Sequence, residues 1–309
     1  MKITLIRPNL GDYRSSDAMA PLDLAVLAAR AHDCDISFYD ERIEPVPLDV
    51  QTDLVALSVE TYTARRAYEI ADAYRAHGAS VVMTGYHPTF LPDEALRHAD
   101  AVVIGDAEGA WEALLADARA GKLAPRYFGS VERPMHDYRI ERRIFDGKRY
   151  LPIEVVQYGR GCRFGCEFCS VHSFYGSSVR HRALDGLLEE IAALPANRLL
   201  FFVDDNLYGP REEFLALLKA LAPLKRRWSC QISIDVARDD VLMDALVEAG
   251  CRFMLIGFES LSADNLRQMG KPWNQVSGAY RDVVRSLHRR GIGIYGTFRC
   301  FASHVIRGA

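Results

Sequence analysis

Short apolar runs alternate with amphipathic segments along the first 125 residues of the chain. The runs have the length of buried strands, and the segments between them place apolar residues at helical spacing. This pattern predicts strands at residues 3–7, 36–39, 54–59, 81–84 and 101–104, and helices at 22–32, 64–77 and 94–98. We therefore expect an α/β domain over residues 1–125, a Rossmann-like doubly wound parallel sheet whose ligands bind at the carboxyl ends of the strands.

The alternation resumes with a different spacing in the second half of the chain. Strands are predicted at residues 153–157, 199–203, 228–234, 253–256 and 292–298. The helices between them carry apolar stripes, which packing against a barrel explains better than partner binding. Polar and glycine residues follow the strands, at 158–170, 204–206, 231–235, 257–260 and 297–299. In a parallel barrel these strand ends share one mouth, so we expect the segments to converge on one site.

Residues 126–150 lack periodicity and mix charges with aromatic residues, which is typical of a structured linker. The predicted organisation is therefore a domain at 1–125, a linker at 126–150 and a second domain at 151–309. A chain of 309 residues is long enough for two domains, each with its own core.

Composition narrows the functional classes without choosing one. A formal charge of -3 argues against a nucleic-acid binder that works by bulk electrostatics. No apolar run approaches membrane-spanning length, and the N-terminus turns polar too soon for a signal peptide, so we expect a cytoplasmic protein. Its seven cysteines, an odd number clustered in one place, fit a reducing compartment.

Three of these cysteines, Cys162, Cys166 and Cys169, form a C-x3-C-x2-C run. Three thiolates this close cannot pair off as disulfides, but they can bind three irons of a cubane cluster and leave the fourth iron open. A zinc site that recruits His172 is an alternative, although structural zinc sites usually bring two separated pairs of ligands. A ferredoxin-type cluster would want a fourth cysteine nearby, whereas Cys230 and Cys251 lie far along the chain in apolar segments.

The spacing, together with the aromatic Phe168 before the last cysteine, resembles the motif of radical S-adenosylmethionine (SAM) enzymes. The resemblance extends over residues 155–298, where the stretches Phe-Phe-Val-Asp-Asp-Asn and Ile-Gly-Phe-Glu-Ser-Leu look like the group that includes the anaerobic magnesium-protoporphyrin cyclase and the B12-dependent radical SAM methyltransferases. It implies a partial (β/α)6-type barrel after the N-terminal sheet. It also implies that the three cysteines ligate a [4Fe-4S] cluster whose open iron binds SAM.

The resemblance also implies roles for other residues near the cluster. Phe168 would support the adenine of SAM, and Asp204, Asp205 and Asn206 would hold its methionine amino group. Gln231 and Glu259 are expected at the ribose or the carboxylate. Alternatively, the Asp-Asp-Asn stretch caps the following helix and Glu259 is a buried salt-bridge partner.

The loops of the N-terminal half resemble the cobalamin-binding domain that precedes the barrel in this group. Ser58 falls where the family has its serine, the turn that holds Gly85 and His87 resembles the family's glycine-rich turn, and Gly105 begins a similar loop. The string Asp-x-His-x-x-Gly, which supplies a histidine ligand to cobalt in mutase-type proteins, is absent. The resemblance therefore implies either cobalamin binding without that histidine or a domain that has lost the cofactor.

The implied activity is reductive cleavage of SAM to a 5'-deoxyadenosyl radical, with electrons from a donor such as flavodoxin or ferredoxin. Methyl transfer, oxidative cyclisation and rearrangement all occur in the group, and the substrate is a small molecule of unknown identity. Family members continue beyond the Gly-Thr-Phe at 296–298, so we expect a barrel that stops after about the fifth strand. The alternative function is a non-catalytic fragment that still binds cluster, SAM or cobalamin.

Overall fold

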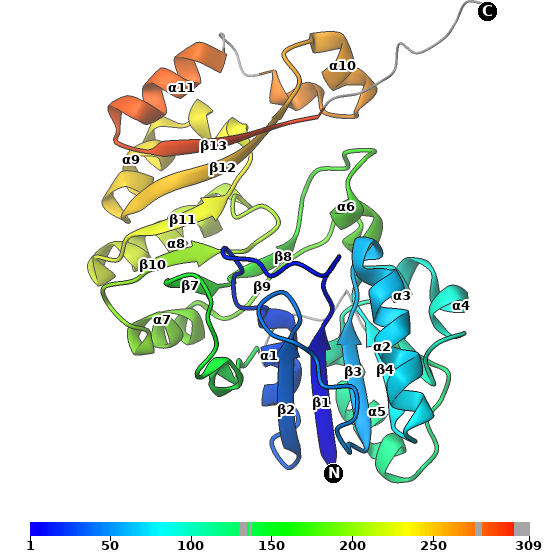
Figure 1. Ribbon diagram of the computed structural model, residues 1–309. Helices are drawn as coiled ribbons and strands as arrows, with labels where there is room; N and C mark the ends of the chain where they lie inside the picture. Colours follow the sequence, from blue (N-terminus) through cyan, green and yellow to red (C-terminus); the bar gives the residue numbers. More distant parts are fainter. Residues whose placement is uncertain (130–134, 136–137, 276–279, 300–309) are drawn as a thin grey trace, which may run out of the picture. The chain divides into compact units, whose positions relative to one another are not determined.

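The computed structural model describes residues 1–129, 135, 138–275 and 280–299, and it divides into two compact units, Met1–Leu151 and Pro152–Ala309. Figure 1 shows that each unit is built on its own sheet. Among the described residues, no helix is both long enough and apolar enough to cross a membrane.

The first unit contains a six-stranded parallel sheet in the order β2-β1-β3-β4-β5-β6. Its strands are β1 (Lys2–Arg7), β2 (Asp35–Asp40), β3 (Leu54–Ser58), β4 (Ser80–Thr84), β5 (Ala101–Ile104) and β6 (Arg126–Phe128). The first five are the strands that the apolar runs predict. Because β1 lies between β2 and β3, the strand order reverses there, and ligands of such sheets bind in the crevice at this reversal.

Helices cover both faces of this sheet, as the doubly wound pattern predicts. Leu54 and Ala56 of β3 belong to the core under α1 (Leu22–Ala29) and α5 (Trp111–Arg119). The alternate residues Val55 and Leu57 belong to the core under α2 (Ala64–Ala76) and α4 (Pro92–Ala95). A fully buried strand with apolar residues on both faces is what a central parallel strand requires.

Residues 126–150 differ from the expected linker, because they fall within the first unit. Strand β6 extends the sheet, and Tyr127 is buried with its hydroxyl donating to Asp117 at 2.8 Å. Phe145 and Tyr150, beside the 3-10 turn Arg142–Phe145, pack against the same core. The apolar pattern misses β6 because only its central residue is buried. Residues 130–134 and 136–137 of this segment lie outside the described residues.

The second unit contains a five-stranded parallel sheet in the order β13-β12-β11-β10-β7, which agrees with the five predicted strands of a partial barrel. Its strands are β7 (Ile153–Val156), β10 (Leu199–Phe202), β11 (Trp228–Gln231), β12 (Cys251–Glu259) and β13 (Gly293–Phe298). One core forms between this sheet and four helices, α7 (Leu184–Ala193), α8 (Arg211–Leu221), α9 (Asp240–Glu248) and α11 (Tyr280–Arg289). The expected stop after the fifth strand concerns residues 300–309, which lie outside the described residues.

Two details of the predicted pattern are corrected. Strand β11 ends at Gln231 rather than at residue 234, because Ile234 begins the 3-10 segment Ile234–Arg238. The turn after β4, expected as a loop, contains the short helix α3 (Tyr86–Phe90). A small antiparallel hairpin of β8 (Gly159–Gly161) and β9 (Val179–His181) was not predicted, since neither three-residue strand shows an alternating pattern.

Candidate functional site

The three cysteines lie on the loop between β8 and the short helix α6 (Ser170–Tyr175), beyond the carboxyl end of β7. Burial raises the pKa of Cys166 to about 11, the Lys271 ammonium acts in the opposite direction, and the neighbouring Cys169 and Cys162 thiols raise it further. Burial also raises the pKa of Cys162, while N–H donors from Phe164 and Asn206 act in the opposite direction. The three thiols therefore lie close enough for the charge of one to change the pKa of another.

The Asp-Asp-Asn turn after β10 contacts the backbone that enters the cysteine loop. The Asp204 carboxylate accepts from the N–H groups of Tyr158 at 3.0 Å and Gly159 at 2.5 Å. The Asp205 carboxylate accepts from the N–H of Gly161 at 2.8 Å. Burial nevertheless raises the pKa of Asp204 to about 7, although the two N–H donors oppose the shift. The turn therefore shapes the segment just before Cys162. The alternative of a cap on the following helix is wrong, because Pro210 precedes α8 and no side chain caps it.

Asn206 and Gln231 extend this contact network to the end of β11. The Gln231 side-chain amide donates to the backbone oxygen of Asp205 at 2.8 Å. The Asn206 amide donates to Cys162 Sγ at 3.7 Å and to Ser233 Oγ at 3.2 Å. The strand ends after β7, β10 and β11 thus meet at the cysteines, as the barrel pattern predicts.

A stack of side chains holds the middle of the cysteine loop. The Phe164 ring lies parallel to the Trp273 ring with centroids 3.5 Å apart. The Arg163 guanidinium lies 4.5 Å from the ring centroids of Phe164 and of Tyr208, and it forms an ion pair with Asp235. Arg163 and Phe164 therefore contact segments that follow three different strands: Tyr208 after β10, Asp235 after β11 and Trp273 after β12.

Glu259 ends β12 with a left-handed backbone, φ 61°, which is strained for a residue with a side chain. Its carboxylate lies 2.9 Å from Lys271 Nζ, and both side chains are buried, with 10% and 8% exposed. Lys271 also donates to the Gly257 oxygen at 3.0 Å. The alternative reading of Glu259 as a buried salt-bridge partner therefore describes its contacts here. Phe168 is half-buried, with the Arg299 guanidinium 4.2 Å from its ring centroid.

The donor set fits a thiolate-bound cluster, because three cysteines lie on one loop and hydrogen-bond donors face the sulfur of Cys162. No group of three or more His, Cys, Asp or Glu side chains within the described part of the chain is arranged to hold one ion. A cubane instead takes each thiolate on a different iron and is stabilised by hydrogen bonds to the sulfurs. Cys162 has such donors in Asn206 and the Phe164 N–H, and the Lys271 cation lies near Cys166.

In the first unit, the loops after β3, β4 and β5 are joined by hydrogen bonds at the carboxyl edge of the sheet. Gly85 has φ 104°, and a Cβ there would lie 2.8 Å from the oxygen of Val59, so only glycine fits. The Thr89 hydroxyl donates to the Gly85 oxygen at 2.8 Å and accepts from the Gly105 N–H at 3.0 Å. Ser58, at the end of β3, donates to the carboxylate of Asp23.

His87 is buried in this edge, with 2% of it exposed. Its Nε2 lies 2.5 Å from the Tyr68 hydroxyl, its backbone N–H donates to the Val59 oxygen, and burial lowers its pKa. These contacts suit a neutral imidazole that shapes the loop. Nδ1 of His87 is buried without a partner among the described residues.

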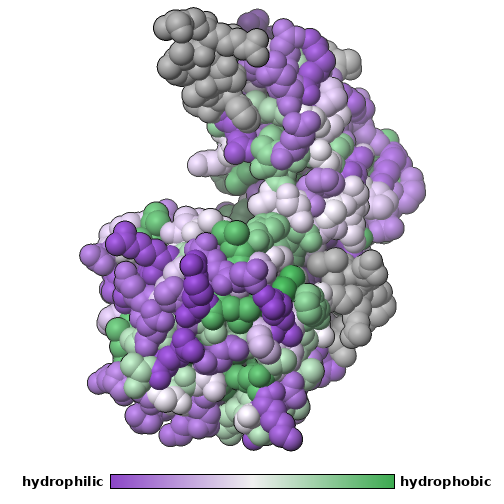
Figure 2. Space-filling model, turned by 90° about the vertical axis from the view of Figure 1, so that its right-hand side faces the viewer, coloured by the Kyte–Doolittle hydropathy of each residue, from purple (hydrophilic) through white to green (hydrophobic). Residues whose placement is uncertain are grey.

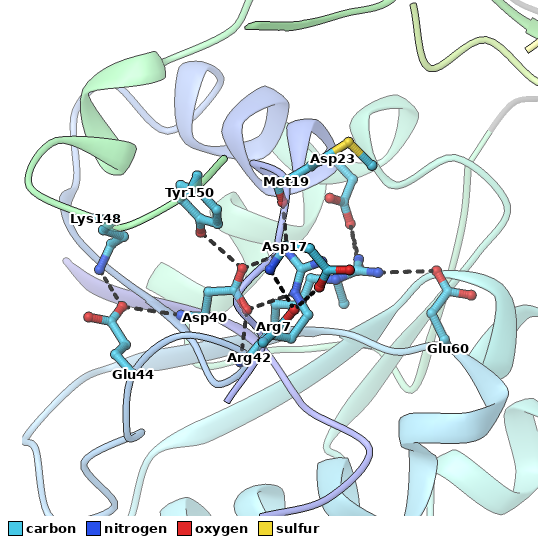
Figure 3. Close-up of polar contacts among 12 residues, drawn as sticks. Arg7, Asp17, Met19, Asp23, Asp40, Arg42, Glu44, Glu60, Lys148 and Tyr150 are labelled. Carbon is cyan, nitrogen blue, oxygen red and sulfur yellow. Dashed lines mark hydrogen bonds and ion pairs between the residues drawn. The ribbon is translucent and has the colours of Figure 1, made fainter. Parts of the chain in front are cut away.

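Charged residues surround the reversal between β1 and β3 (Figure 3). Arg7 at the end of β1 lies 3.6 Å from Asp23 and 3.8 Å from Glu60. Asp40 at the end of β2 is fully buried, pairs with Arg42 at 2.6 Å and accepts from the Tyr150 hydroxyl at 2.9 Å. The carboxyl ends of β1 and β2 therefore carry a set of paired charges.

Apolar side chains lie exposed on neighbouring loops of the same unit. Leu10 and Tyr13 follow β1 and Tyr62 follows β3, and they are 56%, 59% and 61% exposed. The face in Figure 2 is mostly hydrophilic, with hydrophobic residues exposed between the polar ones. This edge of the sheet therefore combines charged residues with exposed apolar residues.

The structure brings the predicted residues into two groups. Cys162, Cys166, Cys169, Phe168, Asp204, Asp205, Asn206, Gln231 and Glu259 lie at the strand ends of the second unit, and Ser58, Gly85, His87 and Gly105 lie at the sheet edge of the first. The sequence did not single out Lys271 or Trp273, and it included Ser233 only as part of the polar segment 231–235. A Lys-Pro-Trp turn directly after Gly270 is the one signal that could have drawn attention to the first two.

Comparison with known proteins covers both units. The B12 binding domain matches residues 22–115 and the Radical SAM superfamily matches residues 156–302. Bacteriochlorophyllide d C-12(1)-methyltransferase of Chlorobaculum tepidum is 35% identical over 291 residues, which cover 90% of this chain and 64% of that protein. Bacteriochlorophyllide d C-8(2)-methyltransferase of the same organism is 32% identical over 284 residues, which cover 85% of this chain and 62% of that protein. The chain thus spans less than two thirds of either relative.

A solved structure shares the fold. The radical S-adenosylmethionine methyltransferase TsrM from Kitasatospora setae, with cobalamin and a [4Fe-4S] cluster bound, matches 96% of this chain and 69% of its own, with a TM-score of 0.74 and 16% identity. The matches to both domain families and to the two relatives confirm the resemblance carried by the cysteine motif and the loops of the first unit. The chain belongs to the radical SAM proteins that carry an N-terminal B12-binding domain.

Proposed function

We propose that the protein is a cobalamin-dependent radical SAM methyltransferase. The observation that carries the proposal is the loop of three neighbouring cysteines at the carboxyl ends of a parallel sheet, in a chain whose other unit is a B12-binding domain. The names of both Chlorobaculum tepidum relatives favour methyl transfer over cyclisation or rearrangement.

In this proposal Cys162, Cys166 and Cys169 hold a [4Fe-4S] cluster. Bound together, the cluster and SAM supply a 5'-deoxyadenosyl radical, and cobalamin supplies a methyl carrier. The hydrogen bonds of Asp204 and Asp205 fix the backbone at the entry of the cysteine loop, and the Phe164–Trp273 stack packs the loop against a neighbouring segment. This preorganisation keeps the reacting groups in place and helps to exclude water.

The roles implied for SAM binding fit polar groups that surround the cysteines. Phe168 offers a half-buried ring for the adenine. Asp205 lies next to the cysteine loop and is the acid we assign to the methionine ammonium, since a bound ammonium needs a nearby carboxylate. Gln231 and the Glu259–Lys271 pair are assigned to the ribose or the carboxylate. A reducing donor such as flavodoxin or ferredoxin would supply the electron.

We place cobalamin at the carboxyl edge of the first unit, beside Ser58, Gly85 and Gly105. His87 is tied to Tyr68 and buried, so it is assigned to the wall of the site and not to cobalt. Cobalamin would then bind without a histidine ligand. Because the two relatives named above are bacteriochlorophyllide d methyltransferases, bacteriochlorophyllide d is the first substrate to test.

The test is anaerobic reconstitution with iron and sulfide, reduction, addition of SAM and cobalamin, and mass spectrometry of 5'-deoxyadenosine and of methylated bacteriochlorophyllide d. Cys166→Ala should abolish both products, whereas Cys34→Ala, which removes a cysteine of the first unit outside the motif, should leave both unchanged. Nucleoside without methylated product would argue against this substrate. An intact cluster that yields no 5'-deoxyadenosine would contradict the proposed enzymatic activity. It would favour a non-catalytic fragment that binds cluster, SAM or cobalamin.

A further inference from the structure

The Asn206 side chain sits between a cluster cysteine and the segment after β11. It is buried, with 8% exposed. Its Nδ2 lies 3.7 Å from Cys162 Sγ and 3.2 Å from Ser233 Oγ, and its Oδ1 lies 3.0 Å from the Ser233 backbone nitrogen. All three contacts join loops that follow different strands.

These contacts determine which way the amide points. Nitrogen and oxygen of an asparagine amide look alike, so their positions have to be inferred from the partners. The Ser233 backbone N–H can only donate, so the atom facing it must be the oxygen. The NH2 group is then turned toward Cys162, where one N–H faces the sulfur and the other has the Ser233 hydroxyl.

An N–H donor aimed at a cluster thiolate changes the redox behaviour of the cluster. Hydrogen bonds to the sulfurs are among the features that set the potential of an iron–sulfur cluster. The positive end of the N–H dipole stabilises the electron-rich reduced state more than the oxidised state, which raises the potential. The hydrogen bond from Asn206, in addition to the bond between iron and sulfur, also holds the Cys162 sulfur in one orientation.

We propose that Asn206 is a positioning residue for Cys162, which orients this thiolate and raises the reduction potential of the cluster through an N–H···S hydrogen bond. This inference rests on the proposed function, because it requires a cluster on the three cysteines. It assigns Asn206 to the cluster, whereas the family resemblance assigns it to the methionine amino group of SAM.

The experiment is an anaerobic redox titration of the reconstituted full chain, followed by electron paramagnetic resonance, without SAM or substrate. Asn206→Leu removes the donor and should shift the potential to a more negative value. Asn206→Asp keeps the size and the acceptor for the Ser233 N–H but replaces the donor by a negative oxygen, so its shift should be larger. Ser233→Ala keeps the backbone N–H that orients the amide and should stay close to the wild type.

Asn274→Ala is the matched control, because Asn274 is a buried amide whose contacts are Phe258 O and the Tyr280 hydroxyl. It should leave the potential unchanged. If Asn206→Leu does not assemble a cluster, the potential of Asn206→Asp tests the inference instead, and it should be more negative than that of the wild type. Potentials equal to the wild type in the Asn206 variants would overturn the inference. A wild-type chain that assembles no [4Fe-4S] cluster would overturn the proposed function itself.

Discussion

At the scale of single residues, Asp204 combines full burial with two backbone hydrogen bonds. Burial disfavours the charged form and raises its pKa from 3.8 to about 7. Between these values the folded chain keeps a proton that the unfolded chain has released, so this group lowers the free energy of unfolding as pH rises from about 4 to about 7. The site therefore contains a carboxyl group whose protonation is linked to folding.

We expect Asp204→Asn to remove this pH dependence, because the amide does not titrate. Its single oxygen accepts from only one of the two N–H groups, which lowers stability at every pH. Urea unfolding at about pH 5 and about pH 8 should show that the stability of the variant relative to wild type increases with pH. The control is Asp239→Asn. Hydrogen bonding to Arg211 lowers the pKa of Asp239, so the pH dependence that this group adds to stability lies below the pH range of the test. A constant difference between Asp204→Asn and wild type would refute the assignment.

The buried pair of Lys271 and Glu259 leads to a second prediction. Lys271→Met leaves the Glu259 carboxylate buried without its cation, which costs about 3–5 kcal/mol of unfolding free energy. The double variant Lys271→Met with Glu259→Gln removes both charges and should recover most of that loss. Chemical denaturation of the wild type, both single variants and the double variant measures the coupling. Strictly additive effects would mean that the two side chains do not stabilise each other.

At the scale of elements, the stack of Trp273, Phe164, Arg163 and Tyr208 connects the cysteine loop to the segments after β12 and β10. An aromatic pair contributes up to about 1.5 kcal/mol, and that energy corresponds to roughly a tenfold change in an opening equilibrium. We therefore expect Trp273→Ala to speed amide hydrogen exchange in residues 162–169 about tenfold. Trp273→Phe keeps a stacking ring and should exchange nearly as the wild type does. Equal protection in Trp273→Ala and wild type would show that the stack does not hold the loop.

Apart from β6, the strands of the two parallel sheets were predictable, because each is a short apolar run between polar turns. Elements with weaker patterns were not: β6 buries only Tyr127, and the β8–β9 hairpin reads Gly-Arg-Gly and Val-Arg-His. Helix α5 was also missed, although Trp111, Leu114 and Leu115 follow helical spacing. Tertiary pairing with an existing sheet edge determines β6, and such pairing leaves little local signal.

The site was predictable to the extent that its residues follow strands or form a motif. The cysteine run and the Asp-Asp-Asn turn are consecutive in the chain, so their chemistry is visible from the sequence. Lys271 and Trp273 reach the cysteine loop from a turn that follows α10 (Ala263–Gln268). Their partners are distant in the chain and depend on packing, so no spacing rule identifies them.

At the scale of the whole molecule, each hydrophobic core among the described residues is built within one unit. The cores on both faces of the first sheet are built from residues of Met1–Leu151, and the core of the second sheet is built from residues of Pro152–Ala309. A unit with its own core can fold alone. Strand β6 and the Phe145–Tyr150 region belong to the first unit, so a cut at residue 125 would remove part of its core, whereas a cut after residue 151 would not.

We therefore expect a fragment of residues 1–151 to fold by itself with one cooperative thermal transition, and a fragment of residues 1–125 to be less stable because it lacks β6. Circular dichroism of both fragments measures this difference.

Trp111→Ala removes a fully buried side chain from the core under α1 and α5, so it should cost about 3–5 kcal/mol in the 1–151 fragment. In the full chain the same change should lower the melting transition of the first unit and leave that of the second in place. A single transition that moves as a whole would show that the two units unfold together, and the fragment boundary would then have no thermodynamic meaning.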